Sequence, residues 1–211
     1  MHSLRQILAA HAPLLVLDAA SARVQVGWFG GSPTTGRWET AEEEAGVGLF
    51  QCLGKLAVDL GEVRGFAFCE GPGSVLGIRT AAVAIRTWCA LAPRPAFAYG
   101  SLALVAAALA GASPGASVVA DARRGHWHRQ ARGRPLERVT VGELSGPLLM
   151  PAGFRHWAPL PPGVGTTPYD LADLLPATAD LDLFRATAEP DAFLHQEPNY
   201  VTWTPQIHRA P

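Results

Sequence analysis

Residues 71–74 are the part of the chain best suited to bind an anion. They read Gly-Pro-Gly-Ser and stand between an apolar run at 65–69 and an Ala-rich segment that extends to Pro93. A glycine-rich turn before a helix directs unpaired N–H groups and the positive end of the helix dipole toward a ligand. The Ser74 hydroxyl can instead accept a hydrogen bond from the first helical turn. The loop is therefore either a phosphate site or a structural turn with a capping serine.

The glycine spacing does not match the common phosphate loops. Five residues separate Gly71 from Gly77 and no Lys follows, whereas a Walker A loop has four and a Lys. Three residues separate Gly73 from Gly77, which is not a dinucleotide fingerprint. Ser74 also lacks the G-x-S-x-G pattern of a nucleophile elbow. We predict a structural turn with Ser74 as N-cap, and we assign no catalytic residue.

Two carboxylates follow apolar runs at matching places in the two halves of the chain. Asp18 ends the run at 14–17 and Asp121 ends the run at 117–120, and each is followed by Ala. The offset of 103 residues is close to half the chain, which predicts two similar lobes with a cleft between them. Such carboxylates either face a ligand at the ends of the strands or cap the next turn through backbone N–H groups. Both interpretations stay open.

Histidines are the other candidate ligands. His126 and His128 lie two apart on a predicted strand and would face the same side, as zinc ligands can. No third ligand stands at motif spacing, because His156, His195 and His208 are scattered. We predict surface histidines and no metal site.

Strands and helices alternate along the chain, which favours an α/β fold. Strands are expected at 14–18, 23–29, 65–70, 96–99 and 117–122, and helices at 4–11, 42–60, 75–91, 101–110 and within 171–183. In the second helix, Glu42, Glu43 and Glu44 would supply negative charge to the first turn. The tail after residue 197 is expected to be extended.

Composition limits the class of protein. The 211 residues are 48% apolar and 17% charged, as in a globular chain, and the net charge of −1 does not favour nucleic-acid binding by overall charge. The arginines at 123, 124, 129, 132 and 134 are a local exception, interpreted here as a solvated turn and strand face. Cys52, Cys69 and Cys89 form no CxxC, and no apolar run is long enough to span a membrane, so we expect a cytoplasmic protein.

Four segments resemble the TsaB (YeaZ) family of proteins required for threonylcarbamoyladenosine on tRNA. Residues 71–79 resemble the GPGSFTGLR motif, residues 121–125 a second motif, residues 15–20 LAIDTS, and residues 197–201 EP-x-YL. The resemblance implies a duplicated actin-like (ribonuclease H-like) ATPase fold with a mixed sheet and helices in each lobe. It divides the chain into an N-terminal extension (1–12), a first lobe (13–111), a shortened second lobe (112–200) and a tail (201–211).

The resemblance also implies a non-catalytic subunit. Its partners would be a TsaD-like catalytic subunit and a TsaE-like ATPase, with homodimers through the same helices and only indirect contact with tRNA. No cofactor would bind the chain alone, and ATP or ADP with Mg²⁺ would bind only in the partner complex. The expected docking residues lie on the helices at 42–60 and 75–91: Leu49, Leu53, Leu56, Gly77, Arg79, Ala82, Ile85 and Arg86.

The chain also departs from the family pattern. Ala19-Ala20 replaces Thr-Ser, Val75-Leu76 replaces Phe-Thr in the loop, and His126 stands in place of a Glu. A nucleotide site would therefore be vestigial, formed by Asp18, Gly71, Gly73, Ser74 and Asp121. The alternatives are an ATPase or sugar-kinase-like enzyme that uses the cleft, and a peptidase, for which no convincing nucleophile or metal set is present.

Overall fold

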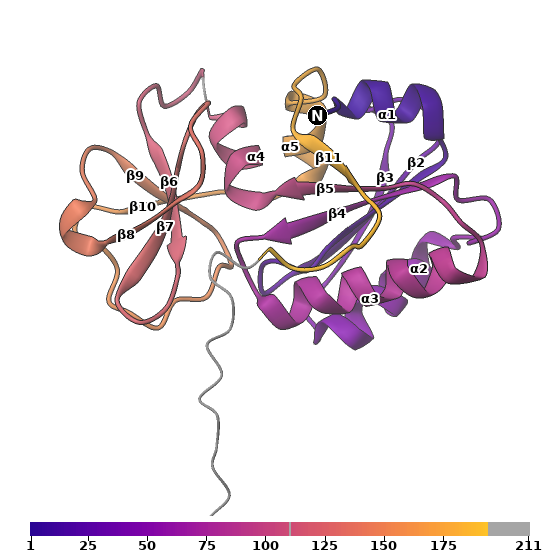
Figure 1. The fold of residues 1–211 in the computed structure, drawn as a ribbon, viewed down its shortest axis with the longest axis horizontal. Coiled ribbons are helices and arrows are strands. Elements are labelled where there is room, and N and C mark those ends of the chain that lie inside the picture. The colour runs from indigo at the N-terminus through magenta and orange to yellow at the C-terminus, as the bar shows by residue number, and fades with distance from the viewer. Residues whose placement is uncertain (110, 194–211) are drawn as a thin grey trace, which may run out of the picture.

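Two β-sheets divide the chain into two lobes in a computed structural model, which describes residues 1–109 and 111–193 (Figure 1). A six-stranded sheet has the order β11-β5-β4-β1-β2-β3 and a five-stranded sheet the order β10-β9-β6-β7-β8. Each begins with three antiparallel strands, followed by two that run parallel to the first. Apart from β11, the two strand orders are the same. The predicted duplicated, two-lobed α/β fold is confirmed.

The first lobe is built around a strand that is buried on both faces. In β1 (Leu14–Asp18), Leu14 and Val16 face one hydrophobic cluster and Leu15 and Leu17 the other, so the sequence is continuously apolar rather than alternating. The other strands here are β2 (Val24–Phe29), β3 (Arg37–Ala41), β4 (Gly65–Gly71) and β5 (Ala96–Gly100).

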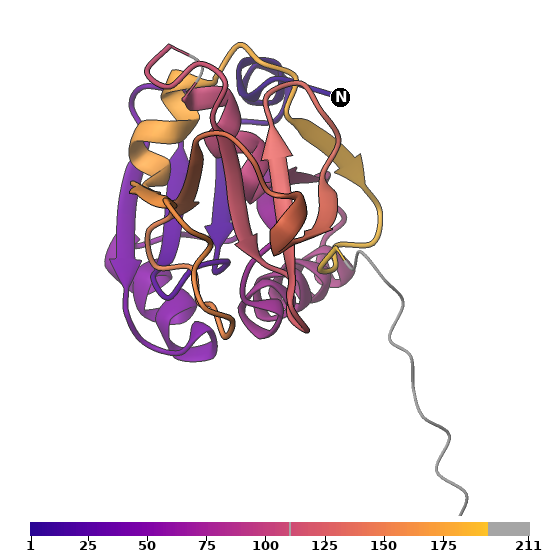
Figure 2. The ribbon, with the colours of Figure 1, turned by 90° about the vertical axis from the view of Figure 1, so that its left-hand side faces the viewer.

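Helices cover both faces of this sheet (Figures 1 and 2). The helices α2 (Ala45–Leu56) and α3 (Val75–Leu91) lie side by side on one face, and α1 (Leu4–His11), α4 (Ser101–Ala108) and α5 (Leu171–Ala177) lie on the other. A capping box between Ser3 and Gln6 begins α1, whose apolar side chains are buried. The predicted N-terminal extension therefore contributes to the core of the first lobe.

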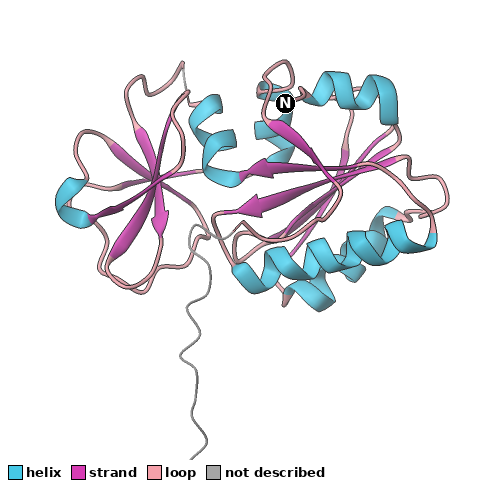
Figure 3. Cartoon of the chain, in the orientation of Figure 1, coloured by secondary structure: helices cyan, strands magenta, loops and turns pink. Residues whose placement is uncertain are grey.

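The second lobe has much less helical cover than the first (Figure 3). Its strands are β6 (Ser117–Asp121), β7 (His126–Ala131), β8 (Glu137–Thr140), β9 (Leu148–Pro151) and β10 (Gly165–Thr167). A single 3-10 turn, η1 (Val141–Glu143), stands where the first lobe has α2, and a loop stands where it has α3. The helix α4 contacts β6 and β7 as well as the first sheet and thus lies between the lobes.

After β10 the chain returns to the first lobe. The helix α5 packs there through Leu171 and Leu175, and β11 (Phe184–Thr187) pairs antiparallel with β5. Residues 184–187 thus lie in the first sheet, although their position in the sequence suggested the second lobe. The segments at 197–201 and 201–211 lie outside the described residues.

The helix α2 differs from its prediction at both ends. It begins at Ala45, so the three glutamates precede the helix instead of occupying its first turn, and Glu44 makes no side-chain capping bond. It ends at Leu56 because Ala57 adopts a left-handed conformation with φ of 49°. Among the described residues, no helix is long and apolar enough to cross a membrane.

Candidate functional site

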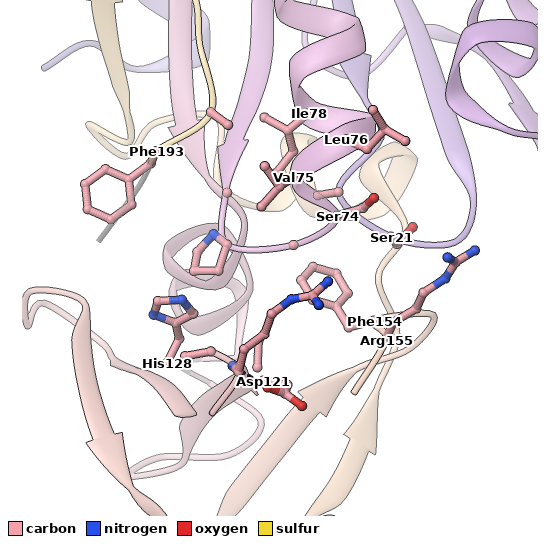
Figure 4. Close-up of a pocket in the computed structure, with 18 of the residues that line it drawn as sticks. Ser21, Ser74, Val75, Leu76, Ile78, Asp121, His128, Phe154, Arg155 and Phe193 are labelled. Carbon is pink, nitrogen blue, oxygen red and sulfur yellow. Dashed lines mark hydrogen bonds between the residues drawn. The ribbon is translucent and has the colours of Figure 1, made fainter. Parts of the chain in front are cut away.

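A cleft of about 510 Å³ separates the two lobes at the start of α3 (Figure 4). The first lobe contributes the loop at 71–74 and the first turn of α3, and the second lobe contributes residues around the end of β6 and residues 154–157. Arg79, Arg123 and Arg155 give the lining positive charge, and Asp121 is the carboxylate at its floor. The Asp18 side chain is fully buried and does not line this cleft.

The loop at 71–74 uses several of its polar groups to hold itself in place. Ser74 is the N-cap of α3, as predicted, and its Oγ accepts a hydrogen bond from the Gly77 N–H at 3.3 Å. The Ser74 N–H donates to the Ala20 carbonyl at 2.7 Å. On the other side, the Ser101 hydroxyl donates to the Pro72 carbonyl at 2.5 Å.

Close packing explains why two positions of this loop and the following helical turn are occupied by glycine. A Cβ at Gly77 would collide with the Ala19 carbonyl oxygen, and a Cβ at Gly73 would collide with that of Ala20. The loop thus lies directly on the turn that follows β1. Gly71 has a φ of 121°, which L side chains rarely adopt. These features support the structural interpretation of the loop over a phosphate cradle.

Asp18 lies at the centre of a buried hydrogen-bond network. Its Oδ2 accepts bonds from the hydroxyls of Tyr99 and Tyr169, each at 2.7 Å, and its Oδ1 accepts the Ala20 N–H at 2.9 Å. The side chains of Asp18, Tyr99 and Tyr169 are almost completely inaccessible to solvent. Both carboxylate oxygens therefore have partners within the fold, and neither faces the cleft.

Burial sets the ionisation of this group. Desolvation raises the pKa of Asp18 above its ordinary value, and the bonds from Tyr169, Ala20 and Tyr99 offset only part of that effect. The pKa values of both tyrosines are raised as well, first through burial and then through the nearby carboxylate, so their hydroxyls stay protonated and donate.

A second buried amide continues the network toward α5. Gln25 on β2 donates to the Tyr169 carbonyl at 3.2 Å and accepts the Leu171 N–H at 2.9 Å. Beside it, the Arg23 guanidinium pairs with Asp170 at 2.9 Å, and Asp170 caps α5. The segment that leads from the second lobe back to the first is therefore fixed to β1 and β2. No local pattern in the sequence indicates these partners of Asp18 and Gln25, because they lie more than eighty positions away.

Asp121 holds two loops of the second lobe together. Its Oδ1 accepts the Arg123 N–H at 2.5 Å, and its Oδ2 accepts the N–H groups of Trp157 and Ala158 at 2.6 and 3.0 Å. Partial burial acts to raise its pKa, but the backbone donors of Ala158, Trp157 and Arg123 outweigh that effect and hold the pKa below its ordinary value. The turn-capping interpretation thus holds for Asp121, and it holds in part for Asp18.

The predicted docking residues lie mostly inside the first lobe. Ala82 and Ile85 are fully buried against the sheet, and the Gly77 site is closed by the chain around it. The same holds for Leu49, Leu53 and Leu56, which are at most 9% exposed. A partner could reach Arg79 and Arg86, which are exposed. Apart from the two arginines, the predicted docking residues therefore belong to the helix faces that pack on the first sheet.

The outward face of the helix pair carries a different apolar set. We call it the α2–α3 patch: Val47, Phe50, Leu76 and Val83, which are 52, 59, 78 and 48% exposed. On α2, a Cβ at Gly46 or Gly54 would meet nothing within 4 Å. Helical spacing alone could not separate the two faces, because apolar residues occupy both.

The histidines within residues 1–109 and 111–193 belong to no cluster that could hold a metal ion. His126 and His128 both lie on β7, as expected, and the His126 Nδ1 is 3.0 Å from the Arg124 carbonyl oxygen. Across residues 1–109 and 111–193, no three His, Cys, Asp or Glu side chains come together in a way that could hold a metal ion.

Solved structures with this architecture were found. YeaZ from Pseudomonas aeruginosa is 20% identical, with a TM-score of 0.54 over 65% of this chain and 74% of that one. An uncharacterized protein with similarity to the peptidase YeaZ, from the same organism, is 17% identical, with a TM-score of 0.55 over 77% and 88%. No protein-family model and no curated protein matches the chain. The likeness establishes a YeaZ-type fold, as the sequence motifs predicted.

Replacement of Gly77 tests the packing of the loop on the turn after β1. We expect Gly77→Ala to destabilise the protein by about 2 kcal/mol, because the added Cβ would displace a backbone carbonyl. Gly54→Ala is the matched control, since its Cβ meets nothing and alanine favours a helix by about 0.5–1 kcal/mol. Urea denaturation measures both, and equal stabilities of the two variants would contradict this packing.

Replacement of Asp18 tests the buried network. Asp18→Ala leaves two tyrosine hydroxyls and one N–H without their acceptor, and we expect a loss of about 3 kcal/mol at neutral pH. Asp18→Asn keeps one acceptor oxygen, enough for the two tyrosine hydroxyls but not also for the Ala20 N–H, so it should lose less than the alanine variant.

The pH dependence of the asparagine variant has a defined sign. Because the folded-state pKa of Asp18 is raised, the folded chain binds a proton more tightly than the unfolded chain, and the wild type loses stability as pH rises between the two pKa values. Asparagine does not titrate. Relative to wild type, Asp18→Asn should gain stability as the pH is raised from acidic to neutral, measured by denaturation at several pH values. A constant difference would show that the Asp18 pKa is not raised.

Proposed function

We propose that this chain is a non-catalytic partner subunit in the synthesis of threonylcarbamoyladenosine on tRNA. In this proposal it binds a TsaD-like catalytic subunit through α2 and α3, and a TsaE-like ATPase joins the same complex. The YeaZ-type fold and the motifs at 15–20, 71–79 and 121–125 support the assignment.

The burial of Asp18 is the observation that carries the non-catalytic part of the proposal. In a cleft enzyme of this architecture, the carboxylate at the end of the first strand would have to face substrate or metal. Here that carboxylate is 0% exposed and is held by two tyrosine hydroxyls and a backbone N–H. Catalysis through Asp18 would require this network to open first.

The α2–α3 patch supports the docking part. Four exposed apolar side chains lie on adjacent helices, and exposed apolar groups of this kind are typical of protein interfaces. The open space over Gly46 and Gly54 lets another helix approach the α2 backbone closely. Arg79 and Arg86, exposed on α3, would supply polar contacts around the apolar centre. A homodimer through the same face would compete with the catalytic partner.

A nucleotide-binding enzyme is the second candidate, favoured by the cleft itself. The cleft, of about 510 Å³, lies beside the N-terminus of α3, and its lining includes Gly71, Gly73, Ser74 and Asp121. ATP with Mg²⁺ should then raise the melting temperature of the isolated protein. In the proposed partner role, by contrast, nucleotide would bind only in the complex, and the isolated protein would need no cofactor. The proposed location for either role is the cytoplasm.

A pull-down with a purified TsaD-like subunit tests the proposal. A charge at Ala82 or Ile85 would enter the core, so the informative substitution is Leu76→Asp, at a side chain that is 78% exposed. We expect it to weaken binding at least tenfold, because a charge would be desolvated at an apolar interface. Leu91→Asp is the matched control on α3: Leu91 is 82% exposed at the opposite end of the same helix, and binding should change less than twofold.

Two results would count against this docking face. Wild-type protein that is folded but does not bind the TsaD-like subunit would remove the partner role. Equal effects of Leu76→Asp and Leu91→Asp would place the interface elsewhere on the surface. ATP hydrolysis by the isolated protein above background would favour the enzyme.

A further inference from the structure

The second lobe has a charge that the whole chain does not show. Residues 112–168 contain seven arginines, no lysine and three acidic residues, for a net charge of +4, whereas the full chain carries −1. Partner docking through α2 and α3 uses none of these arginines.

The acidic groups of this lobe are all engaged locally. Glu137 pairs with Arg129 at 2.7 Å, and Glu143 accepts bonds from the N–H and hydroxyl of Thr140. Asp121 accepts three backbone N–H groups. By contrast, Arg123, Arg124 and Arg155 are exposed and form no salt bridge with any residue in 1–109 or 111–193.

The turn between β6 and β7 presents two of these arginines in a costly conformation. Arg123, Arg124 and Gly125 have φ of 62°, 52° and 74°, in the left-handed region that non-glycine residues rarely adopt. The Asp121 carboxylate and the hairpin bond from the His126 N–H to the Arg123 carbonyl hold the turn. Such strain is typical of sites where a side chain must point in one direction.

An aromatic ring lies directly beside the turn. The Arg123 guanidinium carbon is 3.7 Å from the centroid of the Trp157 ring, and Trp157 is still 60% exposed. Asp121 fixes the backbone at both residues and so sets this stack. A large exposed indole against a guanidinium forms a planar platform on which a base can stack.

The platform connects two hollows. Arg123, Trp157 and Asp121 line both the cleft between the lobes and a shallower hollow of about 540 Å³, which Arg124, Gly125 and Ala158 complete. Arg79 and Arg155 line the cleft (Figure 4 shows Arg155 at its edge). A ligand that followed both hollows would pass four arginines and one stacking platform.

We propose that this surface, the turn surface (Arg123, Arg124, Arg155 and Trp157), binds single-stranded nucleic acid. Arginines would contact successive phosphates, and a base would stack on the Trp157–Arg123 pair. An acidic peptide would satisfy the arginines but leave the platform unused, and a single nucleotide would occupy only one of the two hollows. The inference concerns the isolated chain and does not require the TsaD-like partner.

Fluorescence anisotropy of the purified full chain with a fluorescein-labelled single-stranded RNA of about 12 nucleotides tests the proposal. We expect Arg123→Gln/Arg124→Gln to weaken binding at least tenfold and to lower the slope of log K against log salt by about one to two. The control is Arg132→Gln/Arg134→Gln, which removes the same charge from the turn at the other end of β7 and should change affinity less than threefold. DNA of the same sequence distinguishes the two nucleic acids.

The Trp157 platform has its own readout. RNA should quench tryptophan fluorescence in wild type, and Trp157→Phe should remove most of the quenching while it keeps binding within about threefold. Trp157→Ala should weaken binding about fivefold or more.

The proposal is overturned if RNA and DNA both fail to bind at low salt, or if the two arginine double variants lose affinity equally. It is also overturned if polyglutamate displaces RNA as effectively as unlabelled RNA does, or if ATP does so at the same concentration of phosphate. Thermal denaturation confirms that each variant is folded before its affinity is compared.

Discussion

The carboxylate of Asp18 is the group on which the attachment of the returning segment to the first lobe depends. It is buried at the end of β1, where an unpaired charge would be strongly unfavourable. The hydroxyls of Tyr99 on β5 and of Tyr169, which directly precedes the α5 cap Asp170, stabilise it. Tyr169 lies in the segment that returns from the second lobe. The Gln25 side chain bonds the Tyr169 carbonyl and the Leu171 N–H of the same segment. One buried acid thus joins β1, the strand β5 that lies beyond β4 in the same sheet, and the returning segment.

The two duplicated halves use the same carboxylate in different ways. Both Asp18 and Asp121 accept the N–H two residues further along and so cap the turn after their strand. In the first lobe, two tyrosine hydroxyls bind the acid, and the loop at 71–74 packs on the turn that follows it. In the second lobe, no α-helix within residues 111–193 stands in the place of α2 or α3, and the acid holds an exposed arginine turn. With less helical cover, the second lobe has a surface where the first lobe has a core.

Local patterns predicted several helices and strands, and distant contacts decided the rest of the structure. The helix at 4–11 was predicted at its observed bounds, and Ser74 was identified as a cap, because spacing and capping are local. The strands β3 and β8 were missed because they are partly exposed and lack a clear apolar alternation. Most of the docking residues were placed on the buried faces of their helices, since Val47 and Phe50 are as apolar as Leu49 and Leu53. The partners of Asp18 and the stack at Trp157 depend on tertiary contacts that no local pattern encodes.

The strand β11 makes the larger lobe discontinuous in sequence. It pairs with β5 after the whole second lobe has intervened, so the second lobe is in effect an insertion whose two ends are fixed in one sheet. A lobe anchored at both ends needs less core of its own to stay folded, which accounts for how a domain with only a small apolar cluster can persist. Most of the buried apolar side chains lie in the larger lobe, so that lobe supplies most of the hydrophobic stabilisation of the fold.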